Sequence, residues 1–137
     1  MSGQAEAFLD TNALVYAFTS DPRSVAAQDL LARGCVVGVQ TLNEFANVAR
    51  RKLAMTWPEL DDALSSLRAA CARVVPLDLA IHQDALRIAR RYGFAIFDSL
   101  MISAALSANC TKLWSEDMRH GLLIDDRLKI LDPFRQR

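Results

Sequence analysis

Cysteine, glycine and long apolar runs are all scarce in this sequence, and each scarcity excludes a class of protein. The three cysteines, Cys35, Cys71 and Cys110, are odd in number and form no C-x-x-C pair, which argues against a disulfide framework or a zinc knuckle. The five glycines are scattered, so the chain lacks the glycine-rich phosphate loop of NTPases and dinucleotide-binding dehydrogenases. The apolar run at residues 13–18 is far shorter than the roughly 20 residues of a membrane span. We therefore expect an unexported protein in the reducing cytoplasm, with no membrane anchor.

An excess of charge of one sign is also missing. Sixteen Lys and Arg residues balance sixteen Asp and Glu residues, so the formal net charge is zero. A polyanionic partner would have to be bound by a local basic patch and not by the field of the whole molecule. A length of 137 residues, 52% of them hydrophobic, fits one globular domain over residues 1–137.

Short apolar runs alternate with segments of helical periodicity along the chain. We expect strands at residues 5–9, 35–39, 74–77, 113–114 and 130–131, and helices at 13–18, 21–33, 41–54, 58–71, 79–92 and 99–109. Asp21-Pro22 is typical of a helix start, Asp78 and Gly93 of a helix start and end, and Asp98 of the start of a largely uncharged, buried helix. The alternation predicts an α/β fold: a three-layer α/β/α sandwich with a central, mainly parallel sheet of four to five short strands.

Four acidic residues fall where ligands bind in such a fold. Asp10 follows the first strand, Glu44 lies one turn after the second, Asp98 opens the buried helix, and Asp117 follows the strand at 113–114. Ligands of open α/β sheets bind outside the carboxyl ends of the strands, so these side chains could converge there. Converging carboxylates repel one another unless a cation is present, and they suit Mg²⁺ or Mn²⁺. The predicted chemistry is phosphodiester hydrolysis.

Each acid also has a structural interpretation, because Asp and Glu near helix starts are common caps and dipole partners. The neighbours favour a functional role for two of them. Asp98 is flanked by Phe97 and Leu100, and an ionised group in so apolar a setting needs a partner or a metal. Asp10 stands at the first strand-to-helix turn. Glu44 and Asp117 are less distinctive taken singly.

Four segments resemble, in order and spacing, the acidic motifs of PIN domains. They are Phe8-Leu9-Asp10-Thr11-Asn12, Leu42-Asn43-Glu44-Phe45, Ile96-Phe97-Asp98-Ser99-Leu100 and Leu113-Trp114-Ser115-Glu116-Asp117-Met118. The resemblance extends from about Phe8 to Phe134 and is strongest to the VapC-type toxins of type II toxin–antitoxin systems, which are stand-alone PIN domains of this length. It implies a PIN-like fold and a Mg²⁺-dependent endoribonuclease, with Mn²⁺ as a substitute, that leaves 5′-phosphates. It also implies a homodimer blocked by a small antitoxin protein.

By the same resemblance, Asp10, Glu44, Asp98 and Asp117 are the catalytic and metal-site acids, supported by Asn12 and Ser115. Some choices stay open. Glu116 could replace Asp117, and Asp125 and Asp126 add further acids nearby in sequence. His120, three residues past Asp117, could touch substrate, although a histidine beside Gly121 is more often simply exposed.

Other residues have weaker functional interpretations. Arg50 and Arg51 lie about two turns from Glu44 and are the best candidates for RNA backbone contact, although basic runs are often solvated helix faces. Leu79, His82, Leu86 and Ala89 share one side of the helix at 79–92, where we expect His82 to be a core or boundary residue. No histidine is placed to activate the serines after Asp98, which disfavours a serine hydrolase.

Two rival functions remain. A catalytically silent PIN-like module for binding nucleic acid or protein is disfavoured by four intact acids, since a pure polyanion binder gains nothing from concentrated negative charge. A phosphatase of the haloacid dehalogenase type would need a second Asp where this chain has Asn12.

Overall fold

The computed structural model describes residues 7–135 and is built around one six-stranded sheet. Its strands are β1 (Ala7–Leu9), β2 (Val36–Gly38), β3 (Arg73–Val75), β4 (Lys112–Trp114), β5 (Leu123–Ile124) and β6 (Leu128–Leu131), in the order β3-β2-β1-β4-β6-β5. Every neighbouring pair is parallel except β5 and β6. The predicted mainly parallel sheet is confirmed, with β5 as a strand that the sequence analysis did not find. Residues 5 and 6 of the expected first strand lie outside the described residues.

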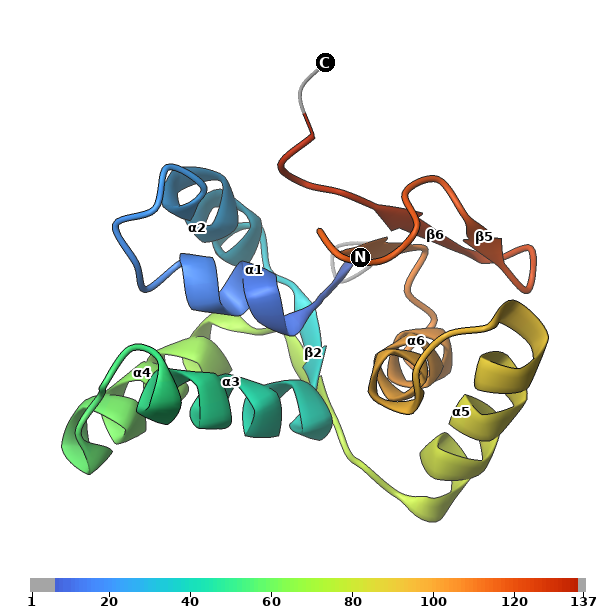
Figure 1. Cartoon of the computed structure of the whole chain (residues 1–137), viewed down its shortest axis with the longest axis horizontal. Helices are drawn as coiled ribbons and strands as arrows, with labels where there is room; N and C mark the ends of the chain where they lie inside the picture. The colour runs from blue at the N-terminus through green and yellow to red at the C-terminus, as the bar shows by residue number, and fades with distance from the viewer. Residues whose placement is uncertain (1–6, 136–137) are drawn as a thin grey trace.

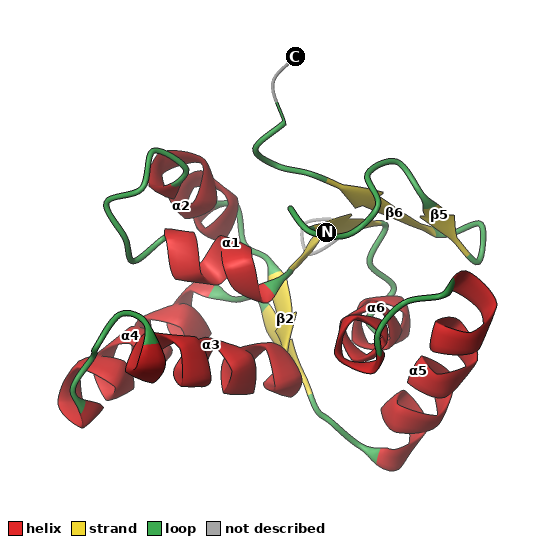
Figure 2. Cartoon of the chain, in the orientation of Figure 1, coloured by secondary structure: helices red, strands yellow, loops and turns green. Residues whose placement is uncertain are grey.

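Within the described residues, six helices cover the two faces of this sheet. They are α1 (Thr11–Tyr16), α2 (Ser24–Ala32), α3 (Val39–Arg51), α4 (Trp57–Ala70), α5 (Leu79–Tyr92) and α6 (Ile96–Ser107). Figure 1 shows α1 to α4 on one side of β2 and α5 with α6 on the other, and Figure 2 shows β2 between the two groups of helices. No helix within residues 7–135 is long and apolar enough to cross a membrane.

The sheet separates two apolar cores. Along β2 the side chains alternate, so that Val36 packs with the α5–α6 core while Cys35 and Val37 pack with the core under α1 to α4. Phe8 and Leu9 divide between the two cores in the same way. Burial on both faces explains why β1 and β2 are short continuous apolar runs, as is usual for parallel sheets.

The register aligns the carboxyl ends of the central strands. Leu9 pairs with Trp114, and Trp114 in turn pairs with Leu131. The chain leaves β1 directly into α1 and leaves β2 directly into α3. Residues that follow β1, β2 and β4 are therefore brought to one edge of the sheet.

Two helix starts differ from the sequence-based expectation. Asp21-Pro22 precedes α2 without starting it: Asp21 Oδ1 accepts the Arg23 N–H (2.8 Å) in a turn, and the helix begins at Ser24. The helix α6 begins at Ile96, so Asp98 lies within its first turn and does not open it. The expected ends of α5 are confirmed, with the Asp78 side chain as N-cap and Gly93 in the left-handed conformation.

The buried face of α5 is not the expected one. Ile81, Ala85 and Ile88 pack in the core, whereas His82 and Leu86 are exposed. Both stripes of this helix are rich in apolar residues, so helical spacing alone does not distinguish them. Contact with α6, the helix against which α5 packs most extensively, decides between them.

Candidate functional site

Asp10 is fixed at the end of β1 by three hydrogen bonds. Its N–H donates to the Trp114 carbonyl (3.1 Å), which extends the pairing of β1 with β4 by one residue. Its carboxylate accepts the Thr11 N–H on Oδ1 (2.5 Å) and the Ser115 hydroxyl on Oδ2 (2.7 Å). The Ser115 hydroxyl also accepts the Met118 N–H (3.2 Å). Ser115 therefore holds both Asp10 and the loop after β4.

Burial dominates the electrostatics of Asp10. Only 5% of the residue is exposed, and loss of hydration raises its pKa from 3.8 to about 6. The bonds from Ser115 and Thr11 lower this pKa, while the negative charges of Asp98 and Asp117 raise it. Asp10 thus interacts with two acids that are distant in sequence but lie at the same edge of the sheet.

Asp98 and Asp117 complete this group. Asp98 is half-buried in the first turn of α6, and burial followed by repulsion from Asp117 raises its pKa. Asp117 is exposed in the loop after β4, where its Oδ2 accepts a hydrogen bond from the Asn12 amide. Asn12, in the first turn of α1, therefore orients one of the predicted acids.

Glu44 is connected to Asp10 through Thr11. The Thr11 hydroxyl donates to Glu44 Oε1 (3.3 Å) while its backbone N–H donates to Asp10. Gln40, one turn earlier on α3, donates to Glu44 Oε2 (3.2 Å). The four predicted acids are thus linked by hydrogen bonds or by charge repulsion at one end of the sheet.

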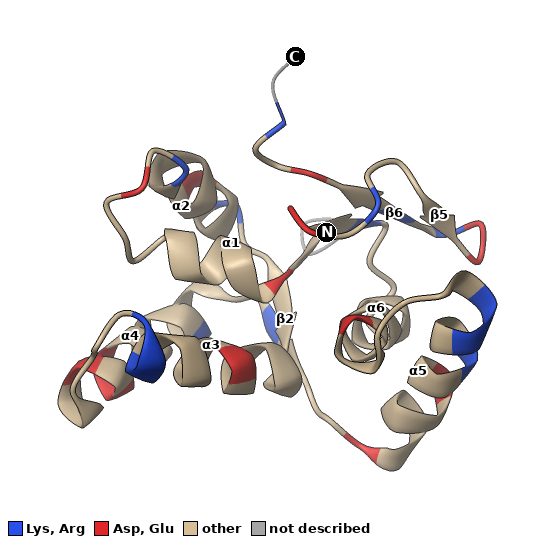
Figure 3. Cartoon of the chain, viewed as in Figure 1, with Lys and Arg blue, Asp and Glu red and all other residues tan. Residues whose placement is uncertain are grey.

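Figure 3 shows acidic positions at the starts of α1 and α6 and on α3, while Lys and Arg positions lie at the far ends of α3 and α5. Within residues 7–135, no three acidic, histidine or cysteine side chains are already gathered closely enough to hold a metal ion. The donor set nevertheless fits a hard divalent cation, because it consists of carboxylate oxygens whose mutual repulsion a cation would relieve.

Glu116, Asp125 and His120, the other candidate residues near Asp117 in sequence, form hydrogen bonds outside the four-acid group. Glu116 accepts hydrogen bonds from the Arg23 guanidinium and the Tyr16 hydroxyl, each at 2.7 Å. Asp125 is bound by Arg87 (2.6 Å) and by Tyr92. His120 Nδ1 accepts the Asp132 N–H (2.9 Å). All of these contacts join segments of the fold and leave the four-acid group apart.

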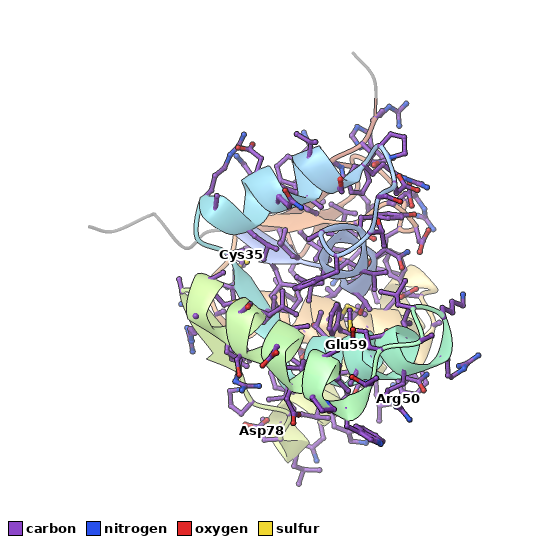
Figure 4. All side chains as sticks on the ribbon, turned by 90° about the vertical axis from the view of Figure 1, so that its left-hand side faces the viewer. Cys35, Arg50, Glu59 and Asp78 are labelled. Carbon is purple, nitrogen blue, oxygen red and sulfur yellow. The ribbon has the colours of Figure 1, made fainter. Side chains whose placement is uncertain are left out.

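The two predicted RNA-contacting arginines lie at the end of α3. The Arg50 guanidinium donates to the Met55 carbonyl (2.6 Å) and stacks over the Trp57 ring at 4.1 Å from its centroid. Figure 4 shows Arg50 where α3 meets the loop to α4. Arg51 is exposed in the last turn of α3. Arg50 is therefore held by a contact within the chain.

A group of polar residues beside Glu44 was not predicted from the sequence. Gln40, Asn43 and Asn47 of α3 line a groove together with Glu44, and Phe97 of α6, the neighbour of Asp98 in sequence, also lines it. The signal was present in the sequence, since residues 40, 43, 44 and 47 share one face of a helix.

These features define a class: an open, mainly parallel α/β sheet with interacting acids at the carboxyl ends of its strands. The family model for the PIN domain matches residues 7–123. The chain therefore belongs to the PIN domain family.

Solved structures share the fold at low sequence identity. A toxin–antitoxin complex from Klebsiella pneumoniae matches with a TM-score of 0.72 and 14% identity, over 95% of this chain and 99% of that one. Mycobacterium tuberculosis VapC20, a toxin that cleaves the sarcin-ricin loop, matches with a TM-score of 0.68 and 15% identity, over 81% of this chain and 89% of that one. DNA-bound VapBC from Salmonella typhimurium matches with a TM-score of 0.65 and 17% identity, over 94% of this chain and 98% of that one. Among curated proteins, none matches the sequence.

Proposed function

We propose that this PIN domain is a Mg²⁺-dependent endoribonuclease and the toxin of a toxin–antitoxin pair. The observation that carries the proposal is the mutual repulsion of Asp10, Asp98 and Asp117 at the ligand-binding edge of the sheet. The charges of Asp98 and Asp117 raise the pKa of Asp10, and the charge of Asp117 raises that of Asp98, so a bound cation would relieve this repulsion.

The residues of the chain have distinct roles in this proposal. A divalent cation bound by the carboxylates would lower the pKa of a water molecule and stabilise charge on the scissile phosphate. Asp10 presents a carboxylate whose direction is fixed by Thr11 and Ser115. Asn12 orients Asp117. Glu44, restrained by Thr11 and Gln40, contributes negative charge from α3.

The chain offers little support for a nucleophilic side chain. The Ser99 hydroxyl donates to the Ala95 carbonyl (2.9 Å), and the Ser103 hydroxyl donates to the Ile81 carbonyl (2.9 Å). The Ser103 hydroxyl also donates to Asp84 Oδ2 (3.2 Å), but within residues 7–135 neither serine is hydrogen-bonded to a histidine that could act as its general base. Attack by water therefore accounts for hydrolysis better than attack by a serine.

The fold also guides the proposals on partners. Neighbours with this fold include VapBC and another toxin–antitoxin complex, so we propose a small antitoxin protein as partner, together with an RNA substrate and a homodimeric state. No disulfide joins Cys35, Cys71 and Cys110, which suits a reducing compartment, and we place the protein in the cytoplasm.

The test is cleavage of total cellular RNA by the purified protein. We expect cleavage with Mg²⁺ or Mn²⁺, none in excess EDTA, and fragments with 5′-phosphate ends. Asp98→Asn should reduce the rate by orders of magnitude, whereas Asp61→Asn, on the exposed side of α4, should behave as wild type. Full activity in EDTA would contradict the proposal, and RNA binding without cleavage would favour the silent binding module.

A further inference from the structure

A groove of about 430 Å³ lies directly beside the candidate site. It is lined by Gln40, Asn43, Glu44, Asn47, Val48 and Phe97, and is called the amide groove below. Its volume falls within the roughly 300–1,000 Å³ typical of small-molecule pockets. Glu44 and the neighbour of Phe97, Asp98, belong to the four-acid group, so the amide groove continues that site along α3.

The lining of the amide groove is polar but mostly uncharged. Gln40, Asn43 and Asn47 each contribute a side-chain amide, which can donate and accept hydrogen bonds. Glu44 is the one charged side chain among the lining residues that the structure describes, and no Lys or Arg is among them. The groove is therefore unsuited to a phosphate group and suited to a neutral ligand with both donors and acceptors.

Phe97 adds a flat apolar surface to these amides. The residue is 58% exposed, although it lies on a helix whose next two turns are almost entirely buried. Unpaired nucleic acid bases stack on exposed aromatic rings of this kind. A ring and several amides around one space are the elements with which proteins read single-stranded RNA.

We propose that the amide groove binds one unpaired purine base of the RNA substrate, stacked on Phe97 with its edge hydrogen-bonded by Asn43 and Asn47. The inference rests on the proposed ribonuclease function and assigns a specificity subsite to it. Asn and Gln side chains pair bidentately with the edge of adenine, which makes adenine the favoured base. The base occupies the amide groove while the adjoining phosphate reaches the acids.

The lining favours a base over a protein helix as occupant. An amphipathic helix binds a groove through a series of apolar anchors three or four residues apart. Val48 and Phe97 are the apolar members among the described lining residues, and the amides between them would be desolvated by such a partner.

Binding can be measured apart from cleavage. Asp117→Asn protein in Mg²⁺ is titrated into fluorescein-labelled ten-nucleotide oligo(A) and oligo(U), and the anisotropy gives Kd for each. We expect tighter binding of oligo(A). Adding Phe97→Ala should weaken oligo(A) binding roughly 5- to 150-fold, the loss of one stacking contact, while Phe97→Tyr should retain it. Adding Asn47→Ala should reduce the preference for oligo(A) over oligo(U).

Matched controls and a second readout make the outcomes distinguishable. Leu79→Ala and Gln83→Ala, an apolar and an amide residue exposed on α5, should leave both Kd values unchanged. An unchanged Kd after Phe97→Ala, or equal binding of both oligonucleotides, overturns the subsite. Wild-type cleavage of RNA with such an unchanged Kd leaves the nuclease proposal intact. Phe97-dependent binding without wild-type cleavage supports the subsite and overturns the nuclease.

Discussion

Asp10 combines deep burial with a carboxyl group that neighbouring acids discourage from ionising. Burial raises its pKa to about 6, and hydrogen bonds from Ser115 and Thr11 offset only part of that effect. Ionised Asp10 therefore lowers the stability of the fold in exchange for a well-oriented carboxylate. Placing a costly group at a functional site is a recognised pattern in enzymes.

This cost predicts a pH dependence of stability for Asp10. The pKa in the folded protein, about 6, exceeds the unfolded value near 3.8, so the folded protein holds more protons between these values. The free energy of unfolding should consequently fall as pH rises from about 4 to 6 and stay lower above that, by at most about 3 kcal/mol. Asp10→Asn should lack this fall. Urea denaturation of both proteins in EDTA between pH 4 and 8 measures it, and parallel curves would contradict the assignment.

A second prediction separates two adjacent acids. Asp117 is exposed and linked to Asn12, so Asp117→Asn should reduce RNA cleavage by orders of magnitude and change the melting temperature little. Glu116 is partly buried and bound to Arg23 and Tyr16, so Glu116→Gln should cost about 1 kcal/mol of stability and leave cleavage near wild type. Thermal melts and initial cleavage rates of both variants distinguish the two acids. The opposite pattern would show that Glu116, and not Asp117, is the fourth acid of the site.

The sequence could not distinguish these two acids because the difference depends on remote partners. Asp10, Glu44, Asp98 and Asp117 could be selected from their positions after strands and at helix starts, and the structure brings them to one edge. Tyr16 lies 100 residues before Glu116, and no local pattern connects them. The stacking of Arg50 on Trp57, seven residues later, was not predicted because it depends on how the loop between α3 and α4 turns.

At the scale of secondary structure, the hairpin of β5 and β6 carries local strain. Asp125 and Asp126 both have positive φ, at 51° and 56°, in a turn closed by the Arg127 N–H bonded to the Ile124 carbonyl (2.9 Å). Turns with two positive φ angles usually contain Asn-Gly or Asp-Gly. The unusual Asp-Asp sequence explains why β5 was not predicted.

The strain gives opposite predictions for the two residues of the turn. Asp126→Gly should raise the free energy of unfolding by about 0.5–1 kcal/mol, since Asp126 is exposed and glycine adopts positive φ without penalty. Asp125→Gly should lower it, because the bonds from Arg87 and Tyr92 are lost. Denaturant midpoints of the two variants test this. A lower denaturant midpoint for Asp126→Gly than for wild type would show that strain does not dominate at residue 126.

Helix α5 marks another limit of periodicity at this scale. The ends of the helix follow from Asp78 and Gly93, which act locally. Its buried face depends on a choice between two apolar stripes. Ile81 and Ile88 are buried because they lie on the side of α5 that packs against α6, whereas Leu79 is 68% exposed. Local signals therefore fixed the extent of the helix, whereas tertiary packing fixed its rotation.

For the whole molecule, cation binding should be coupled to stability. Mg²⁺ at about a hundred times its dissociation constant should stabilise the fold by roughly 2.7 kcal/mol, a rise in Tm of very roughly 5–15 °C for this length. Without metal, Asp98→Asn should be at least as stable as wild type, since it removes one repelling charge.

Thermal melts in EDTA and over a Mg²⁺ series at fixed ionic strength test this coupling. Asp98→Asn should gain much less from Mg²⁺ than wild type, whereas Asp61→Asn on α4 should gain as much. If Asp98→Asn melts well below wild type in EDTA and responds equally to Mg²⁺, then Asp98 is a structural residue and the site assignment fails.

The alternation of strands and helices sufficed to predict a mainly parallel sheet with helices on both faces. The order of the strands could not be predicted, since no local sequence pattern indicates that β1 lies between β2 and β4. That order depends on how the two cores close around the sheet, which is a property of the complete chain.

The central position of β1 has a consequence for synthesis on the ribosome. Its partner β4 follows about 100 residues later, at Lys112–Trp114, and Ser115, which holds the Asp10 carboxylate, comes directly after β4. β1 precedes the other strands of this sheet in the chain and is thus among the last of them to be paired on both sides, because contacts so distant in sequence form late. Until then β1 keeps an unpaired edge that can associate with other chains. A nascent chain therefore has no complete acidic site until translation has passed Asp117.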